Sequence, residues 1–557
     1  MHPRPLRLFA AVAAVLALTA VPSRAASDLG KLDFPTSAGP EAQAHFLRGV
    51  AALHNFWYDE AADEFSAAQK AEPGFALAYW GEAMTYNHPV WSEEDLDAAR
   101  AVLQRLAPTP AERAAKAPTE REKAWLAAVE ALYGEGDKPA RDRAYSAAME
   151  KIRERWPEDV EAGSLYALSL IGPAWATGGA TFGEPKERVL IQAAAVLEEL
   201  FARNPQHPGV LHYMIHAYDD PTHAPLGLRA ARLYAQVAPA AHHALHMPSH
   251  IFVQLGRWDD AAASNEASWA ASVAWVERRK LPIEKQDFHS LSWLSYAYLQ
   301  QGRYEKARET LAIARKAAQE SPVPRIATAL DGMEARYLVE TRSWNEAKLP
   351  AASPQPAAAP ASGGSHCQSP GAAAQSGDHG AMIFAAGLAA ARRGDTATAD
   401  EAAARLRALP KSGPRGGLNY GGGAVEVMEK EISGLALFAK GRKDEGLALL
   451  AEAAKAEDAM TPPSGPPDLL KPAQELYGEA LLEAGQAEEA AAQFHRSLLR
   501  MPERSASLLG AARAAAKLGR EEEARRLYAD LAAIWRQADG SADLAEVRAH
   551  GTAAPAR

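Results

Sequence analysis

The chain has 557 residues, of which 48% are hydrophobic and 23% are charged, and its formal net charge is −10. This composition is typical of a globular protein with more than one core, and an acidic balance without a block of Lys or Arg disfavours a nucleic acid partner. The single cysteine, Cys367, excludes an intrachain disulfide and any metal site built on several thiolates, so a metal site here needs His, Asp or Glu ligands.

The first 25 residues have the layout of a secretory signal peptide. Two arginines within the first seven residues precede an apolar run over residues 8–21, and the short motif SRA follows at 23–25. We therefore expect cleavage at about Ala25 and a periplasmic or secreted protein. The apolar run is shorter than the roughly 20 residues that span a bilayer, and no later run is longer, so we expect no transmembrane segment.

Residues 26–348 are expected to form a first array of paired helices. Small, aromatic, alanine and large apolar residues recur there in a fixed order, at Gly49, Tyr58, Ala61 and Phe65 and again at Gly302, Tyr304, Ala307 and Leu311. Between residues 99 and 233 the spacing is irregular, which predicts helices without a dependable repeat register. No stretch alternates apolar and polar residues as a half-buried strand would.

Residues 349–380 are rich in Pro, Ala, Ser and Gly and lack helical periodicity. Such a composition predicts a linker between two helical arrays. Cys367 lies in this segment, and we interpret it as an unpaired loop residue.

Residues 381–540 are expected to form the second array, and residues 541–557 a disordered tail. Ala490 and Ala524 hold equivalent positions 34 residues apart (524 − 490), and Phe494 corresponds in the same way to Tyr528. Small side chains let two helices approach closely, while bulky ones fill the groove between neighbouring pairs.

This period and these positions resemble the tetratricopeptide repeat (TPR) family. The resemblance implies an all-α fold, a solenoid of helical hairpins arranged here in two arrays, and, with the leader segment, an exported bacterial type of TPR protein. It also implies a concave groove that binds a protein or peptide ligand. In the family, the inner helix of each repeat faces this groove with its second, fifth, ninth, twelfth and thirteenth positions.

Eight of the 17 histidines lie between residues 207 and 250. Imidazole is the commonest metal ligand and titrates near neutral pH. In the repeat register, His243, His246 and His250 fall at the second, fifth and ninth positions of one inner helix, and His289 at the second position of the next. We therefore predict that these four side chains converge in the groove.

The preceding predicted helix adds His212 and His216, whose i, i+4 spacing lets both rings reach one ion. Asp219 and Asp220 follow one turn later and are predicted to orient a histidine or to act as a base. A set of neutral imidazoles suits a transition metal (Zn, Cu, Fe or Ni) better than Ca or Mg. The string HYMIH lacks the glutamate of HExxH, which disfavours a zincin-type protease.

Two further residues are predicted to line the groove, His54 at a thirteenth position and Tyr296 at a ninth. Each histidine also has an alternative interpretation as a hydrogen-bonded packing residue, with tyrosines or the backbone as partners. Pro248 has no N–H and interrupts the helix between His246 and His250, which affects the geometry of that pair.

Two functions of different classes remain open. The first is an exported TPR scaffold or binding protein whose groove, between residues 207 and 289, holds a transition metal. The second is a metal-dependent enzyme that uses the same His and Asp residues, which would need an open coordination position and a placed base. The best understood groove of the family captures a C-terminal carboxylate with Lys and Asn at the positions that histidines occupy here, so that ligand class is not expected.

Overall fold

The computed structural model describes residues 28–177, 180–351, 380–409 and 422–551. Over these residues the fold is all-α, as predicted, with one addition that the sequence pattern did not indicate. Strands β1 (Asn87–His88) and β2 (Glu93–Glu94) pair antiparallel as a very short hairpin. The predicted signal peptide, Cys367 and most of the predicted linker lie outside the described residues.

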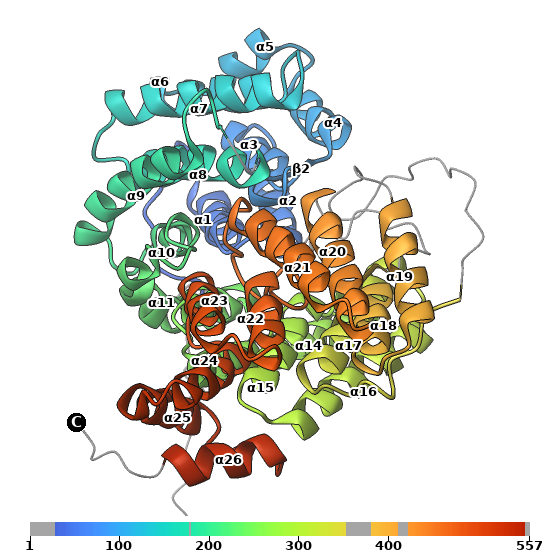
Figure 1. Ribbon diagram of the computed structural model, residues 1–557. Helices are drawn as coiled ribbons and strands as arrows, with labels where there is room; N and C mark the ends of the chain where they lie inside the picture. The colour runs from blue at the N-terminus through green and yellow to red at the C-terminus, as the bar shows by residue number, and fades with distance from the viewer. Residues whose placement is uncertain (1–27, 178–179, 352–379, 410–421, 552–557) are drawn as a thin grey trace, which may run out of the picture.

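The helices follow one another as hairpins, and each hairpin packs against the next along the chain (Figure 1). The first part of the chain contains α1 (Pro40–His54), α2 (Tyr58–Ala71), α3 (Ala76–Met84), a 3₁₀ turn (Pro89–Trp91), α4 (Leu96–Leu106), α5 (Pro110–Ala115), α6 (Glu120–Leu132), α7 (Lys138–Arg155), α8 (Val160–Thr177), α9 (Lys186–Arg203), α10 (Pro208–Ala217), α11 (Ala224–Val237), α12 (His242–His246), α13 (Pro248–Gln254), α14 (Trp258–Arg279), a 3₁₀ turn (Ile283–Lys285), α15 (Phe288–Gln300), α16 (Tyr304–Glu320) and α17 (Pro324–Glu340). The second part contains α18 (Gly380–Arg392), α19 (Thr396–Ala408), α20 (Gly422–Ala439), α21 (Lys443–Asp458), α22 (Ala473–Glu483), α23 (Ala487–Arg500), α24 (Ser505–Lys517), α25 (Glu521–Ile534) and α26 (Ala542–Gly551).

The repeat pattern has a direct packing cause. A Cβ atom added to Gly81 would lie 2.2 Å from the Phe65 ring, and one added to Gly510 would lie 2.3 Å from the Phe494 ring. No side chain fits at either glycine, so the helix that carries it approaches the phenylalanine of the preceding hairpin directly. The same contact therefore occurs in both arrays.

The turns inside the hairpins also match the sequence pattern. Six of them have a glycine with φ between 64° and 84°, a left-handed conformation that glycine adopts without strain, whereas the turn between α1 and α2 has Phe56 at φ 51°. These glycines are Gly256, Gly302, Gly394, Gly441, Gly485 and Gly519.

The boundary between the arrays differs from the predicted one. A first hydrophobic core extends from Phe34 to Ala307, and a second from Ala335 to Val547. Ala335 lies in α17, which packs against α18, so the second core begins before residue 348. The predicted limits at 348 and 381 followed the composition of the linker, and composition does not record which helices α17 contacts.

The prediction of a disordered tail from residue 541 is wrong for its first part. Helix α26 covers Ala542–Gly551 and packs on α25. Leu544 and Val547 are buried in the second core, and this burial orders a helix that has no marked amphipathic pattern of its own.

The two arrays are in direct contact, and in Figure 1 the C-terminal helices lie against the middle of the chain. The indole Nε1 of Trp258 donates to the carbonyl of Glu503 at 2.8 Å, and the hydroxyl of Ser505 donates to the carbonyl of Gln300 at 2.5 Å. Asp539 donates its backbone N–H to the carbonyl of Gly302 at 3.0 Å. The turns of the first array are thus capped by the second.

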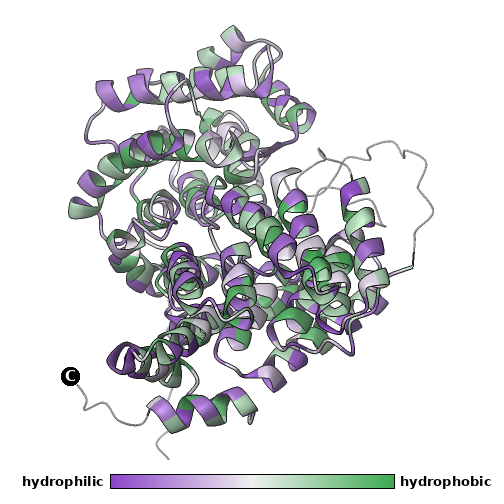
Figure 2. Ribbon diagram, viewed as in Figure 1, coloured by the Kyte–Doolittle hydropathy of each residue, from purple (hydrophilic) through white to green (hydrophobic). Residues whose placement is uncertain are grey.

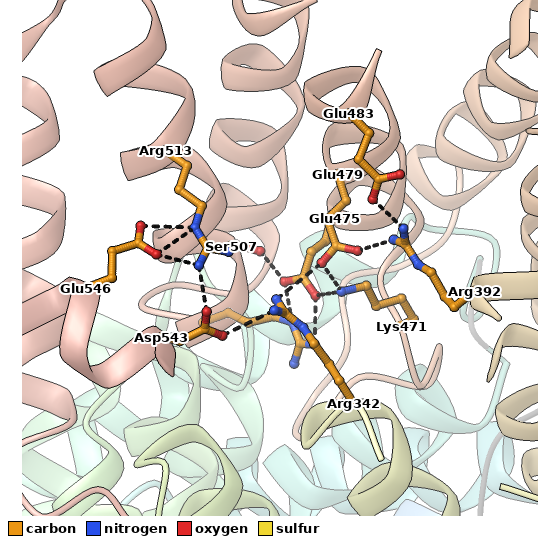
Figure 3. A network of polar contacts seen from close by, with 11 residues as sticks. Arg342, Arg392, Lys471, Glu475, Glu479, Glu483, Ser507, Arg513, Asp543 and Glu546 are labelled. Carbon is orange, nitrogen blue, oxygen red and sulfur yellow. Dashed lines mark hydrogen bonds and ion pairs between the residues drawn. The ribbon is translucent and has the colours of Figure 1, made fainter. Parts of the chain in front are cut away.

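A buried network of ion pairs strengthens this contact. Arg504 is fully buried and contacts Glu340 at 2.7 Å and Glu475 at 2.8 Å. Burial alone would raise the pKa of Glu475, but the charges of Arg504 and Lys471 lower it well below its ordinary value. Figure 3 shows how the pairs continue outward, from Lys471 to Glu475 and Glu479, from Arg392 to Glu479 and Glu483, and from Arg513 to Asp543 and Glu546.

Hydrophobic and hydrophilic residues lie beside one another along most of the helices in Figure 2, which is typical of helices that bury one face. Within the described residues, none of the helices combines the length and the apolar character that a bilayer crossing needs.

Candidate metal centre

The structure brings the six predicted histidines together as two neighbouring groups of three. The first trio consists of His212, His216 and His243, and the second trio of His246, His250 and His289. In each trio, one ring nitrogen from every histidine lies within 4.8 Å of the other two. This spacing allows three imidazoles to coordinate a single ion.

The first trio joins α10 to α12. The Nδ1 of His212 donates to the backbone carbonyl of His54 at 2.7 Å, so the Nε2 of the neutral ring carries a lone pair. That Nε2 lies 3.2 Å from the Nε2 of His243. The Nε2 of His216 is buried and has no hydrogen-bond partner. The first trio therefore has one buried nitrogen without a protein partner, the Nε2 of His216, while the Nε2 atoms of His212 and His243 contact each other.

The second trio joins α12, α13 and α15. The Nδ1 of His246 donates at 2.6 Å to the side-chain oxygen of Asn265, and Asn265 in turn donates to the carbonyl of Ala261, which fixes the orientation of the amide. The Nε2 of His246 then carries a lone pair and lies 3.1 Å from the Nε2 of His250.

The two short Nε2 to Nε2 distances, 3.1 and 3.2 Å, are the most informative geometry of the site. Lone pairs on two ring nitrogens repel, so such a contact is favourable only with a proton or a metal ion between them. Two nitrogens bound at about 2.1 Å to a tetrahedral ion lie about 3.4 Å apart, which is close to the observed spacing. The spacing is therefore compatible with a hydrogen bond between the two rings and with joint coordination of a metal ion.

Proline divides the helix that carries the central histidines. Met247 keeps helical dihedral angles, but Pro248 has no N–H to donate and begins α13. His243, before this point, contributes to the first trio, whereas His250, after it, contributes to the second. His246 also precedes Pro248 yet belongs to the second trio, so the interruption at Pro248 lies within the second trio and not between the two trios.

The six rings are neutral at physiological pH. Burial lowers the pKa of His212, His216, His243 and His246 well below the ordinary value, and neighbouring imidazoles lower it further. Burial, followed by the charge of His289, lowers the pKa of His250 to about 3. Neutral imidazole is the form that binds a metal ion, so the environment favours coordination over protonation.

Aromatic side chains enclose both trios. The ring of Phe56 lies 4.3 Å from that of His212, and the ring of Trp293 lies 4.4 Å from that of His250, measured between centroids. Trp293 is itself covered by the second array, because a Cβ atom on Gly465 would lie 2.3 Å from its indole ring. The site is consequently apolar at its walls and closed partly by residues distant in sequence.

The two predicted aspartates have different positions. Asp219 is buried and lies 2.7 Å from the Nδ1 of His250, while its other oxygen accepts from Gln254. Burial raises the pKa of Asp219, and the hydrogen bond from Gln254 opposes this rise. Asp220 instead contacts the ring and backbone N–H of His223, within its own turn. Asp219 therefore orients a histidine of the second trio, and Asp220 caps a turn.

Neither His54 nor Tyr296 lines an open groove, contrary to the prediction. Both are buried, with 0% and 1% of their surface exposed. The Nδ1 of His54 lies 2.9 Å from the hydroxyl of Tyr213, and Tyr296 accepts from Arg504 at 3.1 Å. The repeat register placed them on the inner face of a helix, but other helices pack against that face here.

A third buried group contains similar residues but is fully hydrogen-bonded. In this group, called the Glu161 cluster, His54, Glu161 and His207 lie close enough to share an ion. The two oxygens of Glu161 contact the Nε2 of His54 at 2.5 Å and the Nε2 of His207 at 2.9 Å. The Nδ1 of His207 accepts from the backbone of Val210, so each ring nitrogen has a partner.

Several residues of the site were not predicted. Asn265 lies in α14 and Glu161 near the start of α8, both outside the histidine-rich segment, and no sequence motif marks either residue. Asp287 caps α15 and approaches the ring of His242 at 3.4 Å. Burial raises its pKa, but the hydrogen bond and charge of His242 lower it well below the ordinary value. In the sequence, the one indication of a role for Asp287 was its position two residues before His289.

The chain was compared with known proteins. No family model matches the sequence, and no curated protein matches it. Among solved structures, the chain is similar to yeast Tom70, with a TM-score of 0.31 and 10% identity over 86% of this chain and 90% of that one. It is also similar to the human IFIT1 dimer with m7Gppp-AAAA, with a TM-score of 0.34 and 14% identity over 91% and 92% of the two chains, and to the P58(IPK) TPR domain, with a TM-score of 0.21 and 12% identity over 86% and 99%. Because these TM-scores are below 0.5, the helical-repeat architecture rests on the helix packing described above.

Proposed function

We propose that this chain is an exported TPR-type protein that binds transition metal ions at two tri-histidine sites. The observation that carries the proposal is the pair of facing Nε2 atoms, 3.1 and 3.2 Å apart, together with the unpartnered Nε2 of His216. A packing role would be expected to give each buried nitrogen a partner, because an unsatisfied polar group in the interior costs about 1–3 kcal/mol.

The chemistry of the ligands narrows the metal. Each trio offers three neutral imidazole nitrogens and no carboxylate, a set that suits Zn, Cu, Fe or Ni and gives little affinity for Ca or Mg. Asn265 and the carbonyl of His54 hold two rings by their Nδ1 atoms, which is how metal-binding histidines are commonly oriented.

Metal content measured on purified protein without a histidine tag tests the proposal. After saturation with Zn²⁺ or Cu²⁺ and removal of free metal, elemental analysis should find two ions per chain. The double variant His243→Ala/His246→Ala removes one ligand from each trio and should lose both. The matched control His223→Ala/His495→Ala removes two histidines outside the trios and should keep both ions. A folded wild-type protein without bound metal would contradict the proposal.

Export is part of the same proposal and has its own test. The segment 1–25 predicts cleavage near Ala25. Expressed with its own N-terminus in a Gram-negative host, the protein should be recovered from the periplasmic fraction, and N-terminal sequencing should begin at about Ala26. Recovery of the uncleaved chain in the cytoplasm would contradict export.

A metal-dependent enzyme is the second candidate. Three protein nitrogens leave a tetrahedral ion with one open position, as in catalytic zinc sites. Both oxygens of Asp219 are occupied, and Asp220 is bonded to His223, so neither predicted base is free to act at that position. A screen of the metal-loaded protein for hydrolysis of ester and phosphoester probes, with the double variant as a blank, would test this candidate.

Binding of a protein or peptide is a third candidate, favoured by a cavity of about 540 Å³ in the second array. Its lining includes charged and aromatic side chains, among them Arg342, Trp344, Arg392, Arg513 and Tyr528. Peptides selected by display against the full chain should lose affinity for the variant Trp344→Ala, whereas peptides that bind both proteins equally would place the partner elsewhere.

A further inference from the structure

The two trios are neighbours, and their rings contact one another across the boundary between them. The centroids of His216 and His250 are 5.9 Å apart, and those of His243 and His246 are 6.0 Å apart. Each of these pairs has one member in each trio. Two ions bound in the trios would therefore be neighbours in one enclosure formed by the six rings and the aromatic side chains around them.

The burial pattern leaves part of each trio accessible to solvent. His212, His216 and His246 are buried, whereas His243, His250 and His289 are each partly exposed. The partly exposed members come from both trios, so solvent contacts at least one histidine of each.

The charge of the ligands determines what kind of solute would bind. The six imidazoles are neutral, and Asp219, the acidic side chain in contact with a trio ring, faces the Nδ1 of His250 and not its Nε2. Two divalent ions would bring four positive charges beside two nearby carboxylates, Asp219 and Asp287, neither of which belongs to a trio. Because uncompensated charge is costly in such surroundings, the open coordination positions favour an anion.

The walls limit the size of that anion. Phe56 and Trp91 lie against rings of the first trio, and Trp293 packs 4.9 Å from the ring of His246 and 5.4 Å from that of His289. These aromatic rings occupy the space into which a bulky ligand would extend. Ligands of one to three atoms remain compatible with the enclosure.

We propose that the two trios form a single dinuclear centre in which the two metal ions share one small bridging anion, hydroxide in the absence of other ligands. This inference rests on the proposed function. The hydroxide arises when a water molecule bound by both ions releases one proton to solvent, a change that adjacent divalent ions favour strongly. Other small anions, such as azide, would replace the hydroxide at the same position.

Electron paramagnetic resonance of the protein loaded with Cu²⁺ tests the bridge. A shared hydroxide couples the two unpaired electrons, so the wild-type protein with two copper ions should lose most of the signal that its copper content would otherwise give. The variant His212→Ala, which keeps the second trio alone, should bind one copper ion and show the full signal for it. Azide should then titrate the wild-type protein with an endpoint of one azide for two copper ions, followed by its absorption band.

The outcomes separate this inference from the proposed function. Two bound copper ions with the full signal of two uncoupled centres, or an endpoint of two azides, would overturn the bridge while leaving metal binding intact. A folded protein without copper would overturn both. If His212→Ala fails to fold, the variant His289→Ala provides the single-site reference, because His289 is partly exposed and lies near the start of α15.

Discussion

The two histidine trios and the Glu161 cluster use similar side chains in similarly buried surroundings, yet the first trio has an unsatisfied ring nitrogen and the Glu161 cluster has none. In the Glu161 cluster, a carboxylate lies between two imidazoles, and every ring nitrogen has a hydrogen-bond partner. In the trios, imidazole faces imidazole, and the Nε2 of His216 has no partner. The same residue type is therefore part of the hydrogen-bonded core in one place and a candidate ligand in the other.

This difference shows what distinguishes a metal site from a packing cluster. Proximity does not, because all three groups bring their donor atoms within 4.8 Å. The distinguishing feature is whether the protein supplies the complementary partner. Glu161 supplies it for His54 and His207, and its own pKa falls well below the ordinary value because the two imidazoles outweigh the effect of burial. In the function proposed above, an ion takes that role in the trios.

The largest expected effect comes from breaking the Glu161 cluster. The variant Glu161→Ala leaves two buried imidazoles without their shared acceptor and should lower the free energy of unfolding by about 3–5 kcal/mol, as for other buried pairs. Urea denaturation measures this change. Metal stoichiometry of the folded fraction should stay at two ions per chain, and a loss of metal would mean that the cluster belongs to the metal centre.

Metal addition should act on the trios and not on the cluster. At a free ion concentration about 100 times the dissociation constant, each bound ion should raise the free energy of unfolding by about 2.7 kcal/mol. Thermal unfolding with and without Zn²⁺ measures the effect, and the double variant His243→Ala/His246→Ala should show none. An equal rise in the double variant would assign the stabilisation to another site.

In the metal-free protein, lowering the pH should change the stability that the second trio contributes but not the stability that the Glu161 cluster contributes. The pKa of His250 is lowered to about 3, so the folded state binds fewer protons than the unfolded state and loses stability as pH falls below about 6.5. At pH 5 this ring alone would account for at most about 2 kcal/mol. Glu161, with a lowered pKa, keeps its contribution at any pH above about 4.5. The variant His250→Gln should therefore show a smaller loss between pH 7 and pH 5 in urea denaturation, and an unchanged loss would contradict the assignment.

Removing a side chain that hydrogen-bonds to a trio histidine should weaken metal binding moderately. Asn265 holds the Nδ1 of His246 at 2.6 Å, and loss of such a partner commonly lowers metal affinity 10–100-fold. Competition with a chromophoric chelator should show this loss for one of the two ions in Asn265→Ala. The variant Gln474→Ala, which removes a buried amide that donates to the carbonyl of Ala454 in the second array, is the control and should keep both affinities.

The smallest expected effect is the change in stability when one histidine is replaced by leucine. Its sign should differ between the first trio and the Glu161 cluster. His216→Leu replaces an unpartnered buried polar group by an apolar one and should stabilise the metal-free protein by about 1 kcal/mol while removing one ion. His207→Leu should destabilise the protein, because Glu161 loses a donor. Denaturation of both variants in the presence of a chelator provides the comparison, and destabilisation of both by similar amounts would contradict the difference drawn here.

The sequence by itself determined the helical hairpins, because helix periodicity, turn glycines and the pairing of glycine with phenylalanine are local or lie within one repeat period. Counting along the repeat also placed His243, His246, His250 and His289 on facing surfaces. Only the tertiary structure decided that His212 and His216 complete a separate trio, that Asn265 and Glu161 take part, and that His54 is enclosed. These depend on how distant helices pack, and the same packing places α17 in the second core. Side-chain contacts between distant segments leave no periodic trace in the sequence, so they could not be predicted from it.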